Sequence, residues 1–254
     1  MAKIVFFVVE NAPKIKDRIP TGEYVVNKED TVFTVIKNML AKDVAIRKIT
    51  IPEGYTVAMI LEELKNNELL LGEITKIPQE ATLMPDTYFY RFGDSKVSIV
   101  SKMKNQMNKV LSLLSAQNKT GLSMEEILIL ASLIEKETSI EEERVLISSV
   151  FHNRLAKKMR LESDPTVIYA LSNGYGKIDR KLARSDLFAD SAFNTYRHAG
   201  LPPTAICCPG EKSILAAMNP AKTNYLYFVA KKEGKEHWFS SNYKDHLARI
   251  KERK

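Results

Sequence analysis

The stretch ILILASLIEKET, residues 127–138, decides the fold, because it begins as a nearly pure apolar run and ends in charged residues. Ser123 and Glu126 stand just before it at the spacing of a capping box, which predicts where the helix begins. Apolar residues cover most of the circumference of this helix, so we expect it to be buried in a core. The rest of the chain is therefore predicted to pack around one central helix.

The end of this helix carries a candidate acid. The buried face continues from Ile134 at helical spacing to Glu137, whereas Glu135 projects roughly 160° away from Glu137. A carboxyl group placed where a buried face ends is partly desolvated, which raises its pKa and favours the protonated form that a general acid needs. Taken alone, the stretch is interpreted more simply as the solvated end of a buried helix. The motifs that follow therefore decide between a solvated helix end and a catalytic acid.

The composition is that of an ordinary globular protein. The chain has 254 residues, of which 44% are hydrophobic and 27% are charged, enough for one large domain or two modest ones. Its formal net charge of +7 suits a polyanion or an anionic surface without naming either. Because the lysines are spread along the chain and no nucleic-acid-binding motif is present, we expect no nucleic-acid partner.

We expect no disulfide, no metal ion and no cofactor. Cys207 and Cys208 are the only cysteines, and a disulfide between neighbours strains the peptide that joins them. The four histidines lack the spacing of metal ligands. No apolar run approaches the roughly 20 residues of a membrane-spanning helix, and the short run at 4–9 is predicted to be a strand.

The first eighty residues alternate strand and helix patterns. Strands are expected at 4–9, 22–26 and 46–51, and helices at 31–40, with Asp30 as N-cap, and at 56–64. The two helices align at a spacing of about 25 residues, with Thr31 matching Thr56. Because a strand–turn–helix unit cannot bury its apolar side alone, we expect the two copies to pack together as a small α+β module. The pattern resembles a LysM-like module, and a structural spacer explains it equally well.

The remainder is predicted to be mainly helical, with one β-hairpin. Helices are expected at 95–117, 140–155, 165–170, 211–218 and 243–254, and strands at 225–230 and 237–240. Asp164 is expected to cap the third of these helices, with Pro165 at its first position. The aromatic residues at 88–92 either line a saccharide groove or pack in a core.

Several long motifs in this part resemble those of the MltG (YceG-like) endolytic murein transglycosylases. They lie in the family's order between about Pro85 and about Leu247, and that order makes the resemblance specific. The motifs are LASLIEKET at 130–138, VFHNRL at 150–155, LESDPTVIY at 161–169, NTY at 194–196, GLPP at 200–203, NPAKT at 219–223 and YLYFV at 225–229.

The resemblance implies an α+β protein of two parts. Residues 1–78 would form a small LysM-like module, which begins abruptly at Met1 as an N-terminally incomplete module would, and residues 79–254 a mainly helical, lysozyme-like catalytic domain with a short β-hairpin. Members of that family generally carry an N-terminal membrane anchor, which is not found in this sequence. The resemblance also implies the cell envelope as location, at the periplasmic face of the inner membrane.

The implied reaction is cleavage of the MurNAc-β-1,4-GlcNAc bond inside peptidoglycan glycan strands, leaving 1,6-anhydro-MurNAc ends and limiting strand length. In that family the acid and base is a glutamate of the EKET segment, which we assign to Glu137, with Glu135 as the alternative. One carboxyl group acts first as acid and then as base, so the second carboxylate of most glycosidases is not required. Two alternatives remain, a non-catalytic peptidoglycan-binding scaffold and a hydrolytic muramidase.

The resemblance also implies substrate-binding residues. Asn194 and Tyr196 would orient groups beside the cleaved bond, and Ser163, Asp164 and Thr166 would shape the loop that faces the glutamate. Helix capping, loop capping and core packing explain these five residues about as well. The implied partners are peptidoglycan glycan strands and the glycan-polymerising penicillin-binding proteins.

Overall fold

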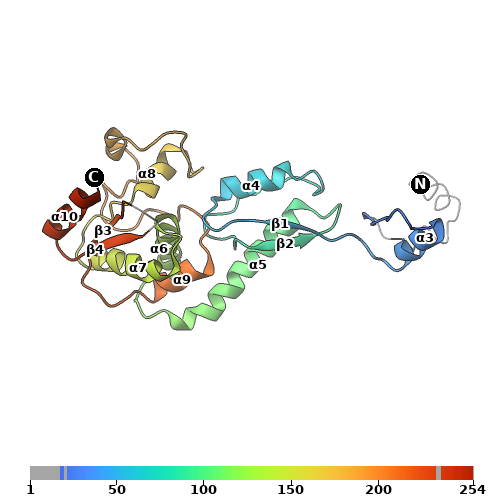
Figure 1. Ribbon diagram of the computed structural model, residues 1–254, viewed down its shortest axis with the longest axis horizontal. Coiled ribbons are helices and arrows are strands. Elements are labelled where there is room, and N and C mark those ends of the chain that lie inside the picture. The colour runs from blue at the N-terminus through green and yellow to red at the C-terminus, as the bar shows by residue number, and fades with distance from the viewer. Residues whose placement is uncertain (1–17, 20–21, 233–235, 254) are drawn as a thin grey trace.

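Three groups of elements follow one another along the long axis of the computed structural model, which describes residues 18–19, 22–232 and 236–253 (Figure 1). One end holds α3 (Val32–Leu40), and the middle holds β1 (Arg47–Thr50), α4 (Val57–Asn66), β2 (Thr87–Tyr90) and much of the long helix α5 (Lys96–Leu114). The other end holds α6 (Met124–Glu137), α7 (Glu141–Ala156), α8 (Asp164–Leu171), α9 (Glu211–Met218), β3 (Tyr227–Ala230), β4 (His237–Ser240) and α10 (Tyr243–Arg253). The described residues also form two short 3-10 helices, η1 (Ser115–Gln117) and η2 (Arg184–Phe188). The mixed α+β class is confirmed.

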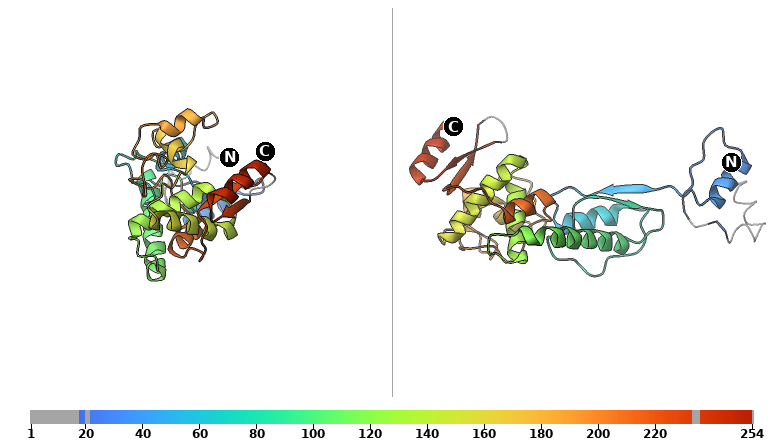
Figure 2. Two further views of the ribbon diagram at one scale, coloured as in Figure 1. Left: turned by 90° about the vertical axis from the view of Figure 1, so that its left-hand side faces the viewer. Right: turned by 90° about the horizontal axis from the view of Figure 1, so that it is seen from below.

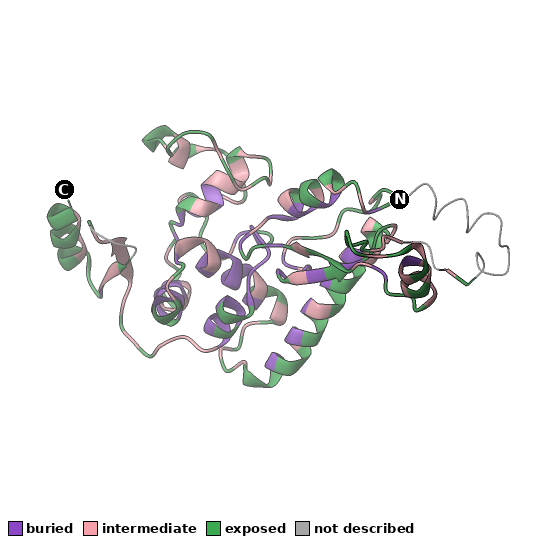
Figure 3. Cartoon of the chain, turned by 45° about the vertical axis from the view of Figure 1, so that its right-hand side comes forward, coloured by how far each residue is buried: buried purple, intermediate pink, exposed green. Residues whose placement is uncertain are grey.

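The central helix forms as expected. In α6 the Ser123 hydroxyl accepts the Glu126 backbone N–H, and the Glu126 carboxylate accepts the Ser123 N–H, which completes the capping box. Nearly the whole helix from Ile127 to Ile134 is buried, and it forms part of the larger of two apolar cores (Figure 3). The Ser132 hydroxyl donates to the Ile129 carbonyl and accepts the N–H of Ile206, which holds the segment before α9 against α6.

The two N-terminal helices begin with the same cap, as their alignment predicts. The hydroxyls of Thr31 and Thr56 each accept the backbone N–H three residues later, at 3.2 and 3.3 Å. The predicted cap at Asp30 is wrong by one residue, because the Asp30 carboxylate accepts the N–H of Asn27 instead. A short polar side chain inside a turn bonds its own turn as readily as the helix that follows.

The expectation that the two copies pack together is also wrong. Helix α3 lies away from the rest of the molecule in Figure 1 and in the right-hand view of Figure 2, whereas α4 packs in the middle core. Residues 22–26 form no strand, and the Glu23 carbonyl accepts the N–H of Ala45. The strand predicted at 4–9 lies outside the described residues.

Strand β1 finds its partner further along the chain. It pairs antiparallel with β2, so that Ile49 lies opposite Tyr88. In β2 the side chains alternate, with Tyr88 and Tyr90 buried and Phe89 exposed, which places most of the aromatic group in the core. The two strands stand on either side of the predicted boundary at residue 78, and the division into 1–78 and 79–254 stays a prediction.

Helix α5 joins the two cores. Its first half contributes Ile99 and Met103 to the middle core, and its second half contributes Met107, Val110 and Leu114 to the core around α6. These residues follow one another at i+3 and i+4 spacing, so a single face of one helix supports both groups of elements. The other predicted helices and the β3–β4 hairpin form close to their expected bounds.

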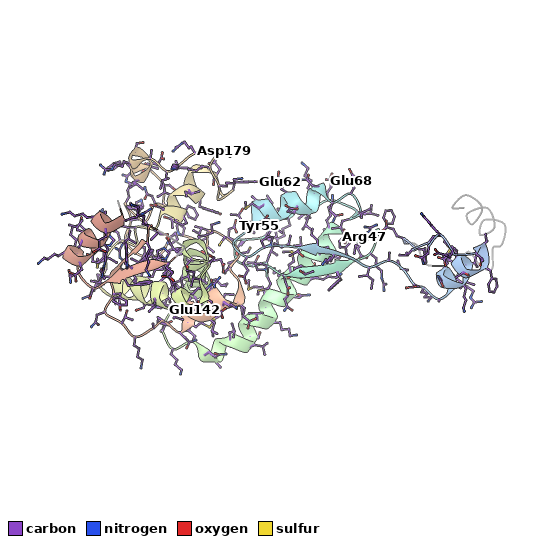
Figure 4. The ribbon with its side chains drawn as sticks, in the orientation of Figure 1. Arg47, Tyr55, Glu62, Glu68, Glu142 and Asp179 are labelled. Carbon is purple, nitrogen blue, oxygen red and sulfur yellow. The ribbon has the colours of Figure 1, made fainter. Side chains whose placement is uncertain are left out.

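The middle group and the α6 group also meet through backbone bonds. The N–H of Gly54 donates to the Cys208 carbonyl at 3.0 Å, and the N–H of Cys208 donates to the Tyr55 carbonyl at 2.8 Å. Figure 4 labels Tyr55 at this junction. Lys136, one residue before Glu137, donates to the Gly54 carbonyl. Both cysteines are buried and free, as the sequence predicts.

The matched caps give a stability prediction. Thr56 is fully buried and its hydroxyl also donates to the Tyr175 carbonyl, whereas Thr31 is exposed. We expect Thr56→Ala to lower the free energy of unfolding by about 2 kcal/mol and Thr31→Ala by less than about 1 kcal/mol. Urea unfolding followed by circular dichroism measures both. Equal losses in the two variants would contradict the role given to the contact with Tyr175.

No helix in the described part of the chain has the length and apolarity needed to cross a membrane.

Candidate active site

A cleft of about 480 Å³ opens at the end of α6. Glu137, the last residue of α6, lines it together with Arg154 from α7 and with side chains of the 161–164 turn. Tyr196, strand β3, the first residue of β4 and helix α10 supply the rest of the lining. Segments far apart in the sequence thus meet around one carboxyl group.

Glu137 has the environment of an acid that is protonated near neutral pH. The pKa of Glu137 is raised to about 7. Burial is the largest cause, the hydrogen bond from Ser163 opposes it, and the nearby Asp164 carboxylate adds to it. The Ser163 hydroxyl donates to Oε1 of Glu137 at 2.5 Å. Because Oε1 accepts that hydrogen, Oε2 is the oxygen left to carry the acidic proton.

Ser163 is held in place from behind. Its N–H donates to Oγ1 of Thr195 at 3.0 Å, and its carbonyl accepts the Thr166 hydroxyl at 2.7 Å. The two threonine hydroxyls are 2.9 Å apart and fully or almost fully buried. The backbone around Ser163 is therefore fixed before any ligand enters.

The start of α8 differs from the sequence prediction by one residue. Asp164 is the first helical residue and Ser163 takes the N-cap position, so the predicted cap at Asp164 is wrong. The Ser163 hydroxyl makes no capping bond because it is committed to Glu137. A position that usually serves a helix end serves the candidate acid here.

Tyr196 and Asp164 form a second polar pair in the cleft. The Tyr196 hydroxyl donates to Oδ1 of Asp164 at 2.6 Å. Burial, Asp164 and Glu137 all raise the pKa of Tyr196, so the phenol stays protonated and keeps donating. This bond holds the Asp164 carboxylate beside the candidate acid.

Asn194 lies behind the cleft wall rather than in the cleft. It is fully buried, and its Nδ2 donates to the carbonyls of Leu187 and Ala189 at 3.0 and 2.8 Å. Its Oδ1 accepts the N–H of Tyr196 at 3.0 Å. All the polar atoms of its side chain are used inside the protein, so Asn194 positions the loop that carries Tyr196. Thr166 is equally buried and supports Ser163 in the same indirect way.

Glu135 points into a different environment. Its Oε2 accepts the N–H of Gly210 at 3.0 Å, and its Oε1 lies 3.6 Å from Nη2 of Arg144. Both side chains of this ion pair are less than a tenth exposed. The alternative acid is thus tied between α7 and the start of α9, away from the cleft that Glu137 lines.

Two cleft residues received no firm role from the sequence. Arg154 donates to the carbonyls of Arg160, Leu161 and Leu226, which fastens the 161–164 turn and strand β3 to α7. His237 donates its N–H to Glu143 and places Nδ1 2.7 Å from the same carboxylate. Arg154 stands inside the VFHNRL motif, but nothing local in that motif shows which distant carbonyls it binds.

No group of three or more His, Cys, Asp and Glu side chains in the described residues is arranged to hold a metal ion.

Comparison with known proteins gives a consistent family. The model described as the YceG-like family matches residues 2–252. Proteins named endolytic murein transglycosylase are similar to this chain. The one of Bacillus subtilis strain 168 is 42% identical over 173 residues, which are 67% of this chain and 47% of that protein. The one of Streptococcus pneumoniae strain R6 is 28% identical over 246 residues, which are 80% of this chain and 44% of that protein.

The fold is also similar to a solved structure. A YceG-like protein of Listeria monocytogenes, solved at 2.6 Å, matches with a TM-score of 0.70 and 32% sequence identity. The match covers 98% of this chain and 90% of that one. The chain spans less than half the length of the curated relatives that it matches.

Proposed function

This chain belongs to the YceG-like family, and on that premise we propose that it is an endolytic peptidoglycan lytic transglycosylase. It cleaves the MurNAc-β-1,4-GlcNAc bond within glycan strands, leaves 1,6-anhydro-MurNAc ends and so limits strand length. The observation that carries the proposal is the Glu137 carboxyl, which lines a cleft, has a pKa of about 7 and accepts a hydrogen bond from Ser163. The names of the relatives from Bacillus subtilis and Streptococcus pneumoniae support the same reaction.

In the proposed reaction one carboxyl group serves twice. Protonated Glu137 gives the proton on Oε2 to the glycosidic oxygen, and the bond from that oxygen to the anomeric carbon of MurNAc breaks. Positive charge develops at the anomeric carbon. The carboxylate then takes the proton of the C6 hydroxyl of the same sugar, whose oxygen bonds to the anomeric carbon. The 1,6-anhydro ring closes, no water is consumed, and Glu137 is protonated again.

The neighbouring residues support this acid. Ser163 directs Oε1 away from the reacting atoms, and its bond keeps the pKa of Glu137 from rising further. The carboxylates of Glu162 and Asp164 line the same cleft and favour positive charge at the anomeric carbon. Tyr196 fixes Asp164, and Asn194 and Thr166 fix the segments that carry these groups.

The finer architecture belongs to the same proposal. The part around α6 to α10, with a glutamate at the end of a buried helix beside a β-hairpin, fits a lysozyme-like catalytic domain at 79–254. The matching caps of α3 and α4 support two related halves at 1–78, as in a LysM-like module, although the described residues of these halves share no sheet. We further propose glycan-polymerising penicillin-binding proteins as partners and the periplasmic face of the inner membrane as location, on family grounds alone.

Mass spectrometry of glycan fragments tests the function. Purified peptidoglycan is incubated with the chain, and the new ends are identified by mass. Anhydro ends inside long strands are expected. Reducing ends would show hydrolysis, the chemistry of a muramidase, and binding without any cleavage would favour the non-catalytic scaffold.

Ser163 gives a prediction on pH dependence. The acid must be protonated to act, so kcat/KM should fall as pH rises through about 7, where Glu137 ionises. Ser163→Ala removes a bond that lowers the pKa of Glu137, so this alkaline limb should move to higher pH. The maximal rate should drop about tenfold, because the carboxyl group loses a positioning contact. Ser139→Ala, at an exposed serine just after α6, serves as the control. If the alkaline limb of the pH profile stays in place in Ser163→Ala, Ser163 does not tune the pKa of Glu137.

A further inference from the structure

The cleft that contains Glu137 carries charge of both signs. Glu137, Glu162 and Asp164 line it on the acidic side, whereas Arg154, His246 and Arg253 bring nitrogen atoms to it from α7 and α10. A cleft for a wholly neutral sugar chain has no need of two arginines. The proposed acid chemistry uses the carboxyl groups and leaves the arginines without a role toward the substrate.

The guanidinium group of Arg154 is only partly used by the protein. Its Nε donates to the Leu226 carbonyl at 2.6 Å, and its Nη1 donates to the carbonyls of Arg160 and Leu161 and to the Glu162 carboxylate at 3.0 Å each. Its Nη2 has no partner among the described residues, although the side chain is only 8% exposed. The buried side-chain polar atoms without a partner in the described residues are the Ser148 hydroxyl and Nδ1 of His246. Because Nη2 of Arg154 has no partner and is not one of these buried atoms, it is open to solvent.

An aromatic ring also fixes the orientation of the Arg154 guanidinium group. The guanidinium carbon lies 5.1 Å from the centre of the Tyr227 ring, and His246 stacks on Tyr227 with ring centres 5.0 Å apart. A planar cation held by four hydrogen bonds and an aromatic face loses little entropy when it binds a ligand. The two hydrogens on Nη2 are therefore a preorganised donor pair.

Arg253 supplies a second cation from the last turn of α10. It lines the same cleft and makes no ion pair or hydrogen bond with any other described residue. In the same helix Arg249 pairs with Glu252 and lies over the Trp238 ring, outside the cleft lining. Arg253 is thus an unpaired charge placed at a cleft.

We propose that Arg154 and Arg253 bind a carboxylate carried by the muramic acid residue of the substrate, and so select that sugar for the cleft. The proposal rests on the proposed function. GlcNAc is neutral, whereas the lactyl group of MurNAc ends in a carboxyl group, either free or extended by a stem peptide with carboxylates of its own. Arginine–carboxylate hydrogen bonds are charge-assisted and geometrically selective. The two sugars of the strand therefore differ most at the group that these arginines recognise.

The test compares glycan strands that differ in this carboxylate. The first keeps its stem peptides, the second has lost them to an amidase and bears free lactyl carboxylates, and the third is the second with those carboxylates converted to methylamides. The 254-residue chain carries Glu137→Gln to stop turnover, and calorimetry gives the Kd for each strand. Arg253→Ala and Arg154→Lys are made in this background, and Lys251→Ala removes one charge from the same helix at a position outside the cleft lining.

We expect at least one of the two carboxylate strands to bind about tenfold more tightly than the methylamide strand. Arg253→Ala should remove most of that preference, and Lys251→Ala should leave it intact. A preference confined to stem-bearing strands assigns the carboxylate to the peptide, and one confined to stripped strands assigns it to the lactyl group. Arg154→Lys keeps the charge but loses the second donor, so it should weaken the preferred strand severalfold in a variant whose folding is checked by circular dichroism.

Two results would overturn the proposal. One is equal affinity for all three strands, and the other is a preference that survives both arginine variants. A cleavage assay on the chain with Glu137 intact shows whether only the carboxylate site is wrong or whether the proposed lyase function is wrong as well. If all strands are cut to anhydro ends with equal affinity, only the carboxylate site is wrong, whereas if no strand is bound or cut, the lyase function falls with it.

Discussion

Replacing Glu137 with Gln is expected to lower the rate of glycan cleavage by about 100- to 10,000-fold. The amide has nearly the same shape and still accepts a hydrogen bond from Ser163, but it has no proton to give to the glycosidic oxygen. Anhydro ends should disappear from the mass spectrum of digested peptidoglycan. Because the same carboxyl group is the proposed acid and base, no second residue replaces it.

Stability measurements distinguish lost chemistry from lost folding in this variant. The pKa of Glu137 is raised from 4.5 to about 7 in the folded protein, so its favourable contribution is full below about pH 4.5 and is lost as pH rises through 7. The amide of the variant does not ionise, so Glu137→Gln should be as stable as the parent chain at low pH and more stable above pH 7. Glu125→Gln, in the exposed first turn of the same helix, should change neither activity nor stability. Full activity in Glu137→Gln would remove Glu137 from the mechanism.

Glu135→Ala is expected to lower the stability of the fold rather than to remove the catalytic proton. It leaves the buried Arg144 with the Ser213 hydroxyl and with Glu53, at 3.9 Å, as its more distant carboxylate, and it leaves the N–H of Gly210 without its acceptor. Removing one partner of a buried ion pair typically costs about 3 kcal/mol or more. For a chain of this size we expect the midpoint of thermal unfolding to fall by roughly 10 °C.

The two glutamates are then separated by one comparison. Glu135→Gln keeps an acceptor for Gly210 and should lose less stability than Glu135→Ala, while it retains cleavage in the temperature range where it is folded. Differential scanning calorimetry and the cleavage assay are run on the same preparations. A folded Glu135→Gln without activity, beside an active Glu137→Gln, would assign the acid to Glu135.

The central helix and the glutamate at its end could be predicted from the sequence for local reasons. The capping box at Ser123 and the apolar run to Ile134 depend on residues within one or two turns of each other, so the pattern alone predicts α6 and its buried face. The same periodicity separates Glu137 from Glu135. The alignment of Thr31 with Thr56 was visible in the same way, although the cap of α3 was predicted one residue too early.

The partners of these elements were decided by contacts between distant residues. A strand pattern does not name its neighbour, so the pairing of β1 with β2 in place of residues 22–26 could not be derived from propensity. The one-residue error at α8 has a similar cause, because Ser163 bonds Glu137, 26 residues earlier in the chain, and not its own helix.

The sequence by itself thus determined the buried helix, the position of the candidate acid at its end and the family, since these depend on local spacing and on motif order. Only the tertiary structure decided what surrounds the acid. The bond from Ser163 to Glu137, the bond from Gly210 to Glu135 and the bond from Arg154 to Leu226 all join segments that lie far apart in the chain. Such contacts form because the apolar faces of α6, α7 and α9 bury one another, and that burial brings the polar groups within bonding distance.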